Sequence, residues 1–123
     1  MTLDTHPEHG GRDTAPTPME TLLLALAGCT AMDVIPILQK MRAPLVDFRV
    51  RVTAERATVH PKVLTAVHLR YETSGPGLQV EQVEKAARLS QEKYCSISAM
   101  LRPVLRLTYK VAVTDTGEQA SVA

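Results

Sequence analysis

The chain has 123 residues, of which 45% are hydrophobic, so it is long enough and apolar enough to form one domain with a real core. Its 14 Lys and Arg residues nearly balance its 13 Asp and Glu residues, and its one Phe and three Tyr offer no ladder of rings on which bases could stack. These numbers argue against a nucleic-acid-binding protein and against attachment to anionic membranes by charge.

The start of the chain has no features of a secretory leader, because Met1–Thr5 has neither a basic start nor an apolar run. The longest apolar stretch, Leu22–Met32, has about 11 residues, short of the ~20 that span a bilayer. We therefore expect a cytoplasmic protein without a membrane segment. In that compartment Cys29 and Cys95 are expected to be free or redox-active, not a permanent disulfide.

An irregular arm, residues 1–17, is expected first, because this segment is rich in Gly, Pro, Thr and Asp and has no periodicity. Thr17 followed by Pro18 is typical of a helix N-cap and first turn. The sequence predicts that this helix runs to about Arg42. Pro36 removes one of its backbone hydrogen bonds and predicts a kink.

This long helix is apolar on every side, since Leu22–Ala27 cover nearly two turns without a polar residue. A helix that is apolar all round is expected to be buried all round. At ~1.5 Å per residue the helix would be about 35 Å long, whereas a domain of this size has a radius of gyration of about 14 Å. One such domain can hardly surround the helix, so we expect a second chain to cover part of it.

The rest of the chain alternates between strand and helix patterns. Strict alternation predicts an antiparallel pair of strands with one dry face, and the amphipathic segment after them has Val83, Ala87 and Ser90 in its apolar stripe. The expected elements are strands over Val46–Thr53 and Val63–Glu72, helices over Leu78–Tyr94 and Ser96–Arg102, and a last strand over Leu105–Val113. We expect one α+β domain over residues 1–113 and a polar tail over 114–123.

The two cysteines are the candidate functional residues. Cys29 is the one residue of the long helix that packing does not require, although most unpaired cysteines are simply small buried hydrophobic residues. Cys95 is expected at the start of a short helix, where free N–H groups and the helix dipole favour a thiolate. Local physics alone therefore predicts the lower pKa for the Cys95 thiol.

Two segments contain these cysteines, PMETLLLALAGCTAMDVIPILQKMR around Cys29 and EKYCSISAML around Cys95. Together they resemble the family of osmotically inducible protein C and the organic hydroperoxide resistance proteins, and within it the third, OsmC-like branch. The resemblance covers about Gly10–Val113 in the same order of elements. It implies an α+β fold in which the long, kinked helix packs on a curved antiparallel sheet, within an intertwined homodimer.

The resemblance also implies a chemistry, that of a small dimeric thiol peroxidase without a metal or other cofactor. Cys29 would attack an organic hydroperoxide and become a sulfenic acid, and Cys95 would condense with it to a disulfide. An external dithiol would restore both thiols; in the better-known branches a lipoylated protein carries it. An apolar lining would favour organic hydroperoxides over hydrogen peroxide. The resemblance thus makes Cys29 the attacking thiol, whereas local physics favours Cys95.

The sequence departs from the peroxidase branches at two positions. There, an arginine on an N-terminal strand, held by a glutamate just before the long helix, stabilises the thiolate. This chain begins beyond that arginine, so we expect the first strands of the family to be missing and Arg12 to be a solvated loop charge. Glu20 is the nearest equivalent of the glutamate, half a helical turn round from Cys29. Glu20 either supports the site across a dimer axis or is an acidic residue favoured in a first turn.

Three functions remain open. The first is the thiol peroxidase. The main alternative is a non-enzymatic OsmC-like module that senses redox state through the same cysteines or binds a small apolar ligand. The third is a protein that lacks the first strands of the family and has only a structural or dimer-forming role. A metal site is not expected, because the four histidines, His6, His9, His60 and His68, do not have the spacing of a zinc site.

Overall fold

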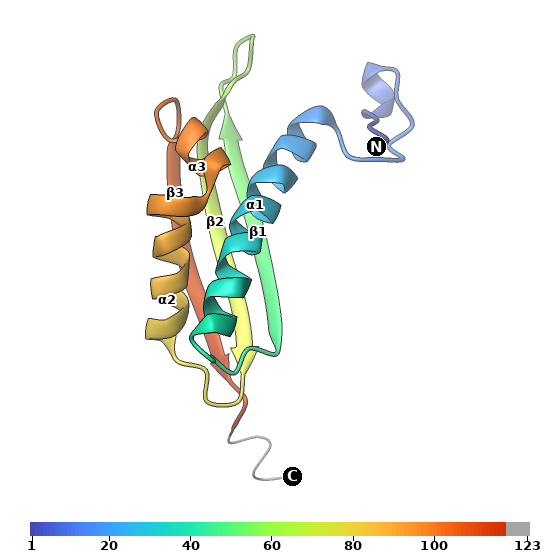
Figure 1. Cartoon of the computed structure of the whole chain (residues 1–123). Helices are drawn as coiled ribbons and strands as arrows, with labels where there is room; N and C mark the ends of the chain where they lie inside the picture. The colour runs from blue at the N-terminus through green and yellow to red at the C-terminus, as the bar shows by residue number, and fades with distance from the viewer. Residues whose placement is uncertain (118–123) are drawn as a thin grey trace.

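Three strands form a mixed sheet, and the helices pack on one face of it (Figure 1). The computed structural model describes residues 1–117. The elements in chain order are η1 (Pro7–His9), α1 (Pro18–Lys40), β1 (Asp47–Arg56), β2 (Leu64–Gly75), α2 (Val80–Leu89), the π-helix η2 (Ser90–Tyr94), α3 (Ser96–Leu101) and β3 (Arg106–Asp115). The α+β class that the sequence predicts is confirmed.

Helix α1 begins where the sequence predicts. The Thr17 side chain accepts a hydrogen bond from the N–H of Glu20 at 3.2 Å, and the Glu20 carboxylate accepts one from the N–H of Thr17 at 2.9 Å. This reciprocal pair satisfies two N–H groups that a helix start otherwise leaves free. Pro18 occupies the first helical position, where its missing N–H costs nothing.

The sheet has β2 at its centre and is only partly antiparallel. Strand β1 runs antiparallel to β2, as predicted, with Val50 opposite Tyr71. The prediction of an antiparallel sheet was wrong for β3, which runs parallel to β2 and places Val111 beside Tyr71. The reason lies in the connection, because α2, η2 and α3 carry the chain back along the sheet before β3 begins.

The predicted helix over Leu78–Tyr94 is divided in two. Helix α2 ends at Leu89, and the next five residues form the π-helix η2. The wider turn buries both Ser90 and Gln91, and it leaves Tyr94, a predicted member of the apolar stripe, 52% exposed. Strand β3 extends to Asp115, so the first residues of the predicted tail belong to the sheet, and 118–123 lie outside the described residues.

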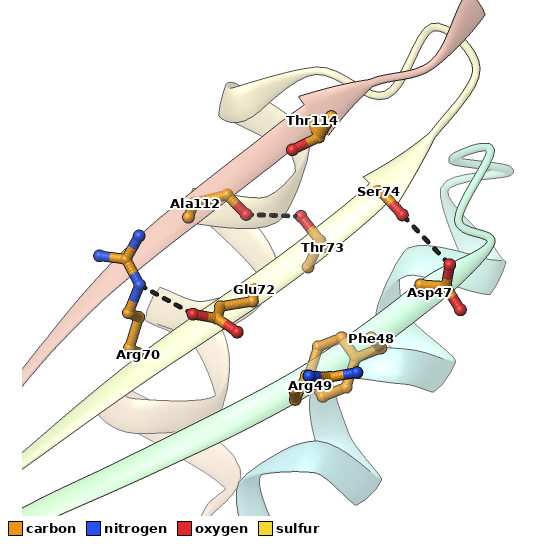
Figure 2. Close-up of a pocket in the computed structure, with 9 residues that line it drawn as sticks. All are labelled: Asp47, Phe48, Arg49, Arg70, Glu72, Thr73, Ser74, Ala112 and Thr114. Carbon is orange, nitrogen blue, oxygen red and sulfur yellow. Dashed lines mark hydrogen bonds and ion pairs between the residues drawn. The ribbon is translucent and has the colours of Figure 1, made fainter.

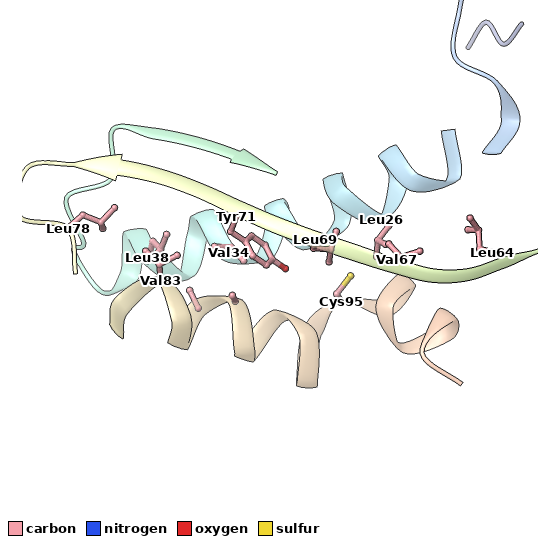
Figure 3. Close-up of a cluster of buried hydrophobic side chains, with 12 residues drawn as sticks. Leu26, Val34, Leu38, Leu64, Val67, Leu69, Tyr71, Leu78, Val83 and Cys95 are labelled. Carbon is pink, nitrogen blue, oxygen red and sulfur yellow. The ribbon is translucent and has the colours of Figure 1, made fainter. Parts of the chain in front are cut away.

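The core lies between the inner face of the sheet and the helices (Figure 3). Most of its buried residues come from α1, β2 and α2. The buried apolar residues are Leu26, Val34 and Leu38 of α1, Leu64, Val67, Leu69 and Tyr71 of β2, Val83, Ala86 and Ala87 of α2, and Leu78 and Cys95 of the connecting segments. Strand β2 is the most deeply buried strand because it has a neighbour on each side and helices above it.

Helix α1 is not covered on all sides within a single chain. Leu24 is 59% exposed and Met32 is 79% exposed, because the sheet and α2 reach only one side of the helix. By length and composition the 23-residue helix would pass for a membrane span, although its uninterrupted apolar stretch, Leu22–Met32, has about 11 residues. In this fold its buried stripe packs on β2 and α2, as in the core helix of a globular domain.

The N-terminal arm is short of regular structure but is hydrogen-bonded around one carboxylate. Asp4 accepts hydrogen bonds from the hydroxyl and N–H of Thr14 and from the N–H groups of Thr5 and Arg12. These contacts, those of Thr14 first, hold the pKa of Asp4 well below its usual range. The arm therefore has one defined shape, and it extends away from the sheet at the start of α1 (Figure 1).

Candidate thiol site

The first turn of α3 brings the two cysteines together. Cys95 is the N-cap of α3, and its Sγ accepts a hydrogen bond from the N–H of Ser98 at 3.4 Å. The backbone N–H of Ile97, one residue earlier, acts on the Cys29 thiol and lowers its pKa. The Cys29 Sγ also lies 3.9 Å from the hydroxyl of Ser96. Both thiols are free, and the same helix start stabilises both sulfurs.

The two thiols differ in exposure. Cys95 is only 3% exposed and lies where η2 joins α3, with its sulfur directed toward β2 (Figure 3). Cys29 is half-buried on α1 and packs at the edge of the same core. A thiol that must meet an external molecule is better placed at Cys29, whereas Cys95 is reached only from within the site.

The surroundings move the pKa values of the two thiols in opposite directions. Burial raises the pKa of Cys29, but the N–H of Ile97, the Cys95 thiol and the Ser96 hydroxyl together outweigh it and hold that pKa below the ordinary value. Burial dominates at Cys95 and raises its pKa. The prediction that Cys95 has the lower pKa was therefore wrong, because burial raises the pKa of Cys95 more than the hydrogen bonds at the start of α3 lower it.

Glu20 lies at the start of α1, away from the thiols. Its carboxylate is exposed, and the hydrogen bonds with Thr17, the one to the backbone N–H first, lower its pKa. Within residues 1–117 no hydrogen bond joins Glu20 to either cysteine. In the single chain Glu20 is the acidic first-turn residue of the helix, and a supporting role across a dimer axis stays a prediction.

The charge next to Cys29 is negative. Asp33, one turn further along α1, is the charged group that acts on this thiol within the described part of the chain, and it raises the pKa of Cys29 against the hydrogen bonds. Arg12 is exposed in the N-terminal arm, where its backbone N–H binds Asp4. The arginine of the peroxidase branches thus has no counterpart beside Cys29 among residues 1–117.

A buried polar network beside Cys29 was missed by the sequence analysis. The Thr30 hydroxyl lies 2.6 Å from the Tyr71 hydroxyl and 2.7 Å from the Ser90 hydroxyl. The Gln91 amide donates to Thr30 at 3.2 Å and to Tyr71 at 2.9 Å, and Ser90 donates to Asp33 at 2.9 Å. Burial raises the pKa of Tyr71 to about 12. The network joins α1, β2 and η2 directly behind the thiols.

One signal of this network was present in the sequence. Ser90 stands in the predicted apolar stripe of its helix, and a polar residue on a buried face needs a hydrogen-bonding partner. Gln91 gave no such signal, because only the wide turn of η2 rotates it inward beside Ser90. Turns of this kind inside helices occur frequently at functional sites.

A polar hollow of about 430 Å³ lies on the outer face of the sheet (Figure 2). Arg70 and Arg51 each donate through Nε to Glu72, at 3.1 Å and 2.9 Å. The hollow is lined by sheet residues and contains neither cysteine. It is therefore separate from the thiol site, which lies on the helical side of the sheet.

The histidines make local contacts. The Nδ1 of His68 lies 2.8 Å from the Thr108 hydroxyl, and the Nδ1 of His6 lies 3.3 Å from the Asp13 carboxylate. Over residues 1–117, no three side chains of His, Cys, Asp or Glu come together in a way that could hold a metal ion.

The structure is an α+β domain with two neighbouring free thiols. One is half-buried on the long helix α1, and the other is buried at the start of α3; these features define the class of protein. The comparisons then give the family. The protein-family model described as "OsmC-like protein" matches residues 10–110, and the chain belongs to that family. It is 42% identical over 101 residues to protein YhfA of Escherichia coli strain K12, covering 82% of this chain and 75% of that protein.

Solved structures agree with this assignment. An OsmC-like protein from Mycoplasma pneumoniae has a TM-score of 0.77 at 19% identity, covering 93% of this chain and 82% of that one. An organic hydroperoxide resistance protein OsmC from Legionella pneumophila has a TM-score of 0.67 at 18% identity, covering 92% and 81%. At these identities the likeness shows the fold alone. The resemblance read from the two cysteine segments is confirmed at the level of the family.

Proposed function

We propose that this protein is a thiol-dependent peroxidase that reduces organic hydroperoxides. The observation that carries the proposal is the difference between the two thiols. Cys29 is more exposed and has a lowered pKa, whereas Cys95 is buried and has a raised pKa. A peroxide-reducing cysteine must attack as a thiolate, and a second thiol in reach protects it from irreversible oxidation. The names of fold neighbours as organic hydroperoxide resistance proteins support the substrate class.

The proposed cycle has three steps. The Cys29 thiolate attacks the terminal oxygen of the hydroperoxide; an S–O bond forms, the O–O bond breaks, and the alkoxide leaves and takes up a proton as an alcohol. The Cys95 sulfur then attacks the sulfenic sulfur of Cys29, forming the disulfide and releasing water. An external dithiol, which we expect on a lipoylated protein, reduces the disulfide, becomes oxidised itself and returns both thiols.

The second step requires Cys95 to ionise in a buried place. The fully buried hydroxyl of Ser98 lies near enough to Cys95 to lower its pKa, and it has no hydrogen-bonding partner among residues 1–117. A buried hydroxyl without a partner is costly in the resting protein. It is free to donate to the Cys95 sulfur when negative charge develops there, which supports Cys95 as the resolving thiol.

We further propose that the protein works as an intertwined homodimer in the cytoplasm. Leu22, Leu24 and Met32 are 38%, 59% and 79% exposed along α1, and a second copy would cover this apolar face. Strands β1 and β3 are the edges of the sheet and each has one unpaired side. A reducing compartment would keep both thiols reduced between cycles.

Steady-state consumption of cumene hydroperoxide in the presence of a dithiol tests the proposal. The wild-type protein should consume many equivalents of hydroperoxide, and Cys29→Ser should consume none, because the attacking sulfur is gone. Matched thermal unfolding of the two proteins shows that the fold is unchanged. A wild-type protein that leaves the hydroperoxide intact with every dithiol tested would reject the proposal.

A redox sensor is the second candidate. The observation that favours it is the negative charge of Asp33 next to Cys29. A negative charge disfavours the thiolate, so the reaction of Cys29 with peroxide is slower than it would be beside a cation. A sensor would be oxidised reversibly without sustained consumption of hydroperoxide, whereas a peroxidase consumes hydroperoxide in repeated cycles with a dithiol. The same steady-state measurement therefore separates the two.

A further inference from the structure

The polar network behind Cys29 is a hydrogen-bond chain with one direction. Ser90 donates its single hydroxyl proton to Oδ2 of Asp33 at 2.9 Å. Ser90 must then accept from Thr30 at 2.7 Å, and Thr30, having given its proton, must accept from Tyr71 at 2.6 Å. Counting protons thus orders the chain from Tyr71 through Thr30 and Ser90 to Asp33.

The hydrogen bonds of the Gln91 side chain are compatible with this direction. Its amide group has two protons, and it donates them to Tyr71 and Thr30. Both oxygens are therefore acceptors toward Gln91 and have only their own hydroxyl protons to pass on. Arg102 donates to the backbone carbonyl of Gln91 and ties η2 to the end of α3. Because Tyr71, Thr30 and Ser90 are fully buried, no competing water is needed to complete this accounting.

The hydrogen-bond chain ends at Asp33, beside the candidate nucleophile Cys29. Asp33 follows Cys29 by four residues on α1, a spacing that places two side chains about 5–6 Å apart at Cβ on the same helix face. The negative charge of Asp33 acts on the Cys29 thiol. The same carboxylate borders an open, mainly apolar cavity of about 540 Å³ between α1 and α2, which Lys40 and Lys85 also line. Asp33 therefore lies on the same helix face as Cys29 and also borders a cavity that is open to the outside.

The hydrogen-bond chain also holds one oxygen of the Asp33 carboxylate in place. Ser90 donates to Oδ2 of Asp33. In the part of the molecule that the structure describes, no hydrogen bond engages Oδ1. A carboxylate fixed through one oxygen by a buried chain presents its second oxygen in one orientation, which is what a positioned acid or base requires.

We propose that Asp33 transfers the proton in the peroxide-reducing step and that Tyr71, Thr30 and Ser90 are its positioning residues. The inference rests on the proposed peroxidase function. Asp33 accepts the proton of the Cys29 thiol, and the thiolate attacks the terminal oxygen of the hydroperoxide. The S–O bond forms as the O–O bond breaks, and the departing alkoxide takes the proton from Asp33. The thiol has become a sulfenic acid, the hydroperoxide an alcohol, and Asp33 is ionised again.

Asp33→Asn tests the inference through two rates measured at pH 7 on the reduced protein. The first is alkylation of Cys29 by iodoacetamide, followed by peptide mass spectrometry, which reports the thiolate alone. The second is oxidation of Cys29 by cumene hydroperoxide, which also needs a proton for the alkoxide. Loss of the negative charge should raise the alkylation rate severalfold, whereas loss of the proton carrier should lower the peroxide rate about 100-fold.

This opposite movement of the two rates is the distinguishing result. If Asp33 acted only through its charge, both rates would rise; if it only held the structure, both would fall together or stay unchanged. Any of these outcomes overturns the inference. If the wild-type protein itself does not react with hydroperoxide, the proposed function fails, and the alkylation rates still report whether Asp33 and Cys29 are coupled.

Two further variants sharpen the test. Ser90→Ala removes the donor to Asp33 but leaves the carboxylate and both thiols, so the peroxide rate should fall about tenfold while alkylation of Cys29 changes less than twofold. Glu84→Gln, on the exposed side of α2, removes one negative charge far from the thiols and should change neither rate. A Ser90→Ala protein with the wild-type peroxide rate would show that the chain does not position Asp33.

Discussion

The two thiols share one helix start but lie in different surroundings. Cys29, on α1, is half-buried and receives hydrogen bonds that lower its pKa, whereas Cys95, at the junction of η2 and α3, is almost fully buried and has a raised pKa. The free N–H groups of α3 serve both sulfurs, so the helix start cannot be what separates them. The comparison teaches that burial decides which of two neighbouring cysteines ionises first.

The largest effect is expected from removing one thiol at a time. Cys95→Ser should lose turnover completely but still react once with hydroperoxide, because the Cys29 sulfur is intact and only the disulfide step is missing. Dimedone labelling followed by mass spectrometry should find the sulfenic acid on Cys29. Full turnover by Cys95→Ser would mean that the second thiol has no part in the cycle.

Tyr71, which is buried near Cys95, predicts a loss of stability at high pH. Burial raises the pKa of Tyr71 to about 12, so above pH 10 the unfolded protein loses this proton before the folded protein does. Stability therefore falls as the pH rises from about 10 to 12, by an amount on the order of 2–3 kcal/mol for this group. Urea unfolding of the wild type and of Tyr71→Phe at pH 8 and pH 11 checks this. The variant should lose less stability over that interval, and an equal loss would contradict the assignment.

Selective alkylation sharpens the comparison directly. With limiting iodoacetamide at pH 7, Cys29 should be modified at least about tenfold faster than Cys95, because it has the larger thiolate fraction and is more exposed. Peptide mass spectrometry of the two cysteine-containing fragments gives both rates from one sample. Denatured protein is the control, and there the two rates should become similar.

The smallest effect is expected far from both thiols. Thr17→Ala removes the side-chain oxygen that accepts from the N–H of Glu20 and should lower the free energy of unfolding by about 1 kcal/mol. Thermal unfolding measures the change, and the alkylation rate of Cys29 should remain that of the wild type. A changed thiol rate would show that the start of α1 reaches the site within one chain.

Local patterns in the sequence predicted most of the elements. Thr17 and Pro18 marked the start of α1, and strict alternation marked the antiparallel pair of β1 and β2. The parallel pairing of β3 could not be predicted in the same way, because it depends on how α2, η2 and α3 return the chain along the sheet. Strand alternation is the same for both directions of pairing.

The site was predicted less completely than the fold. The cysteine segments indicated the two thiols, and the structure brings both to the start of α3. The order of their pKa values depends on how deeply each is buried, which is a result of packing between α1 and α3. The hydrogen-bond chain joins Thr30, Tyr71 and Ser90 from three distant segments, so no local pattern could reveal it.

The most direct test of the central claim is to map the sulfur bonds after adding one equivalent of cumene hydroperoxide to the fully reduced protein. Digestion under non-reducing conditions followed by mass spectrometry should recover the Cys29 and Cys95 peptides joined by a disulfide within one chain. The mass of the intact protein should fall by about 2 Da and return on reduction with a dithiol. Unjoined peptides with both thiols still reduced, or a disulfide only between copies, would contradict the account.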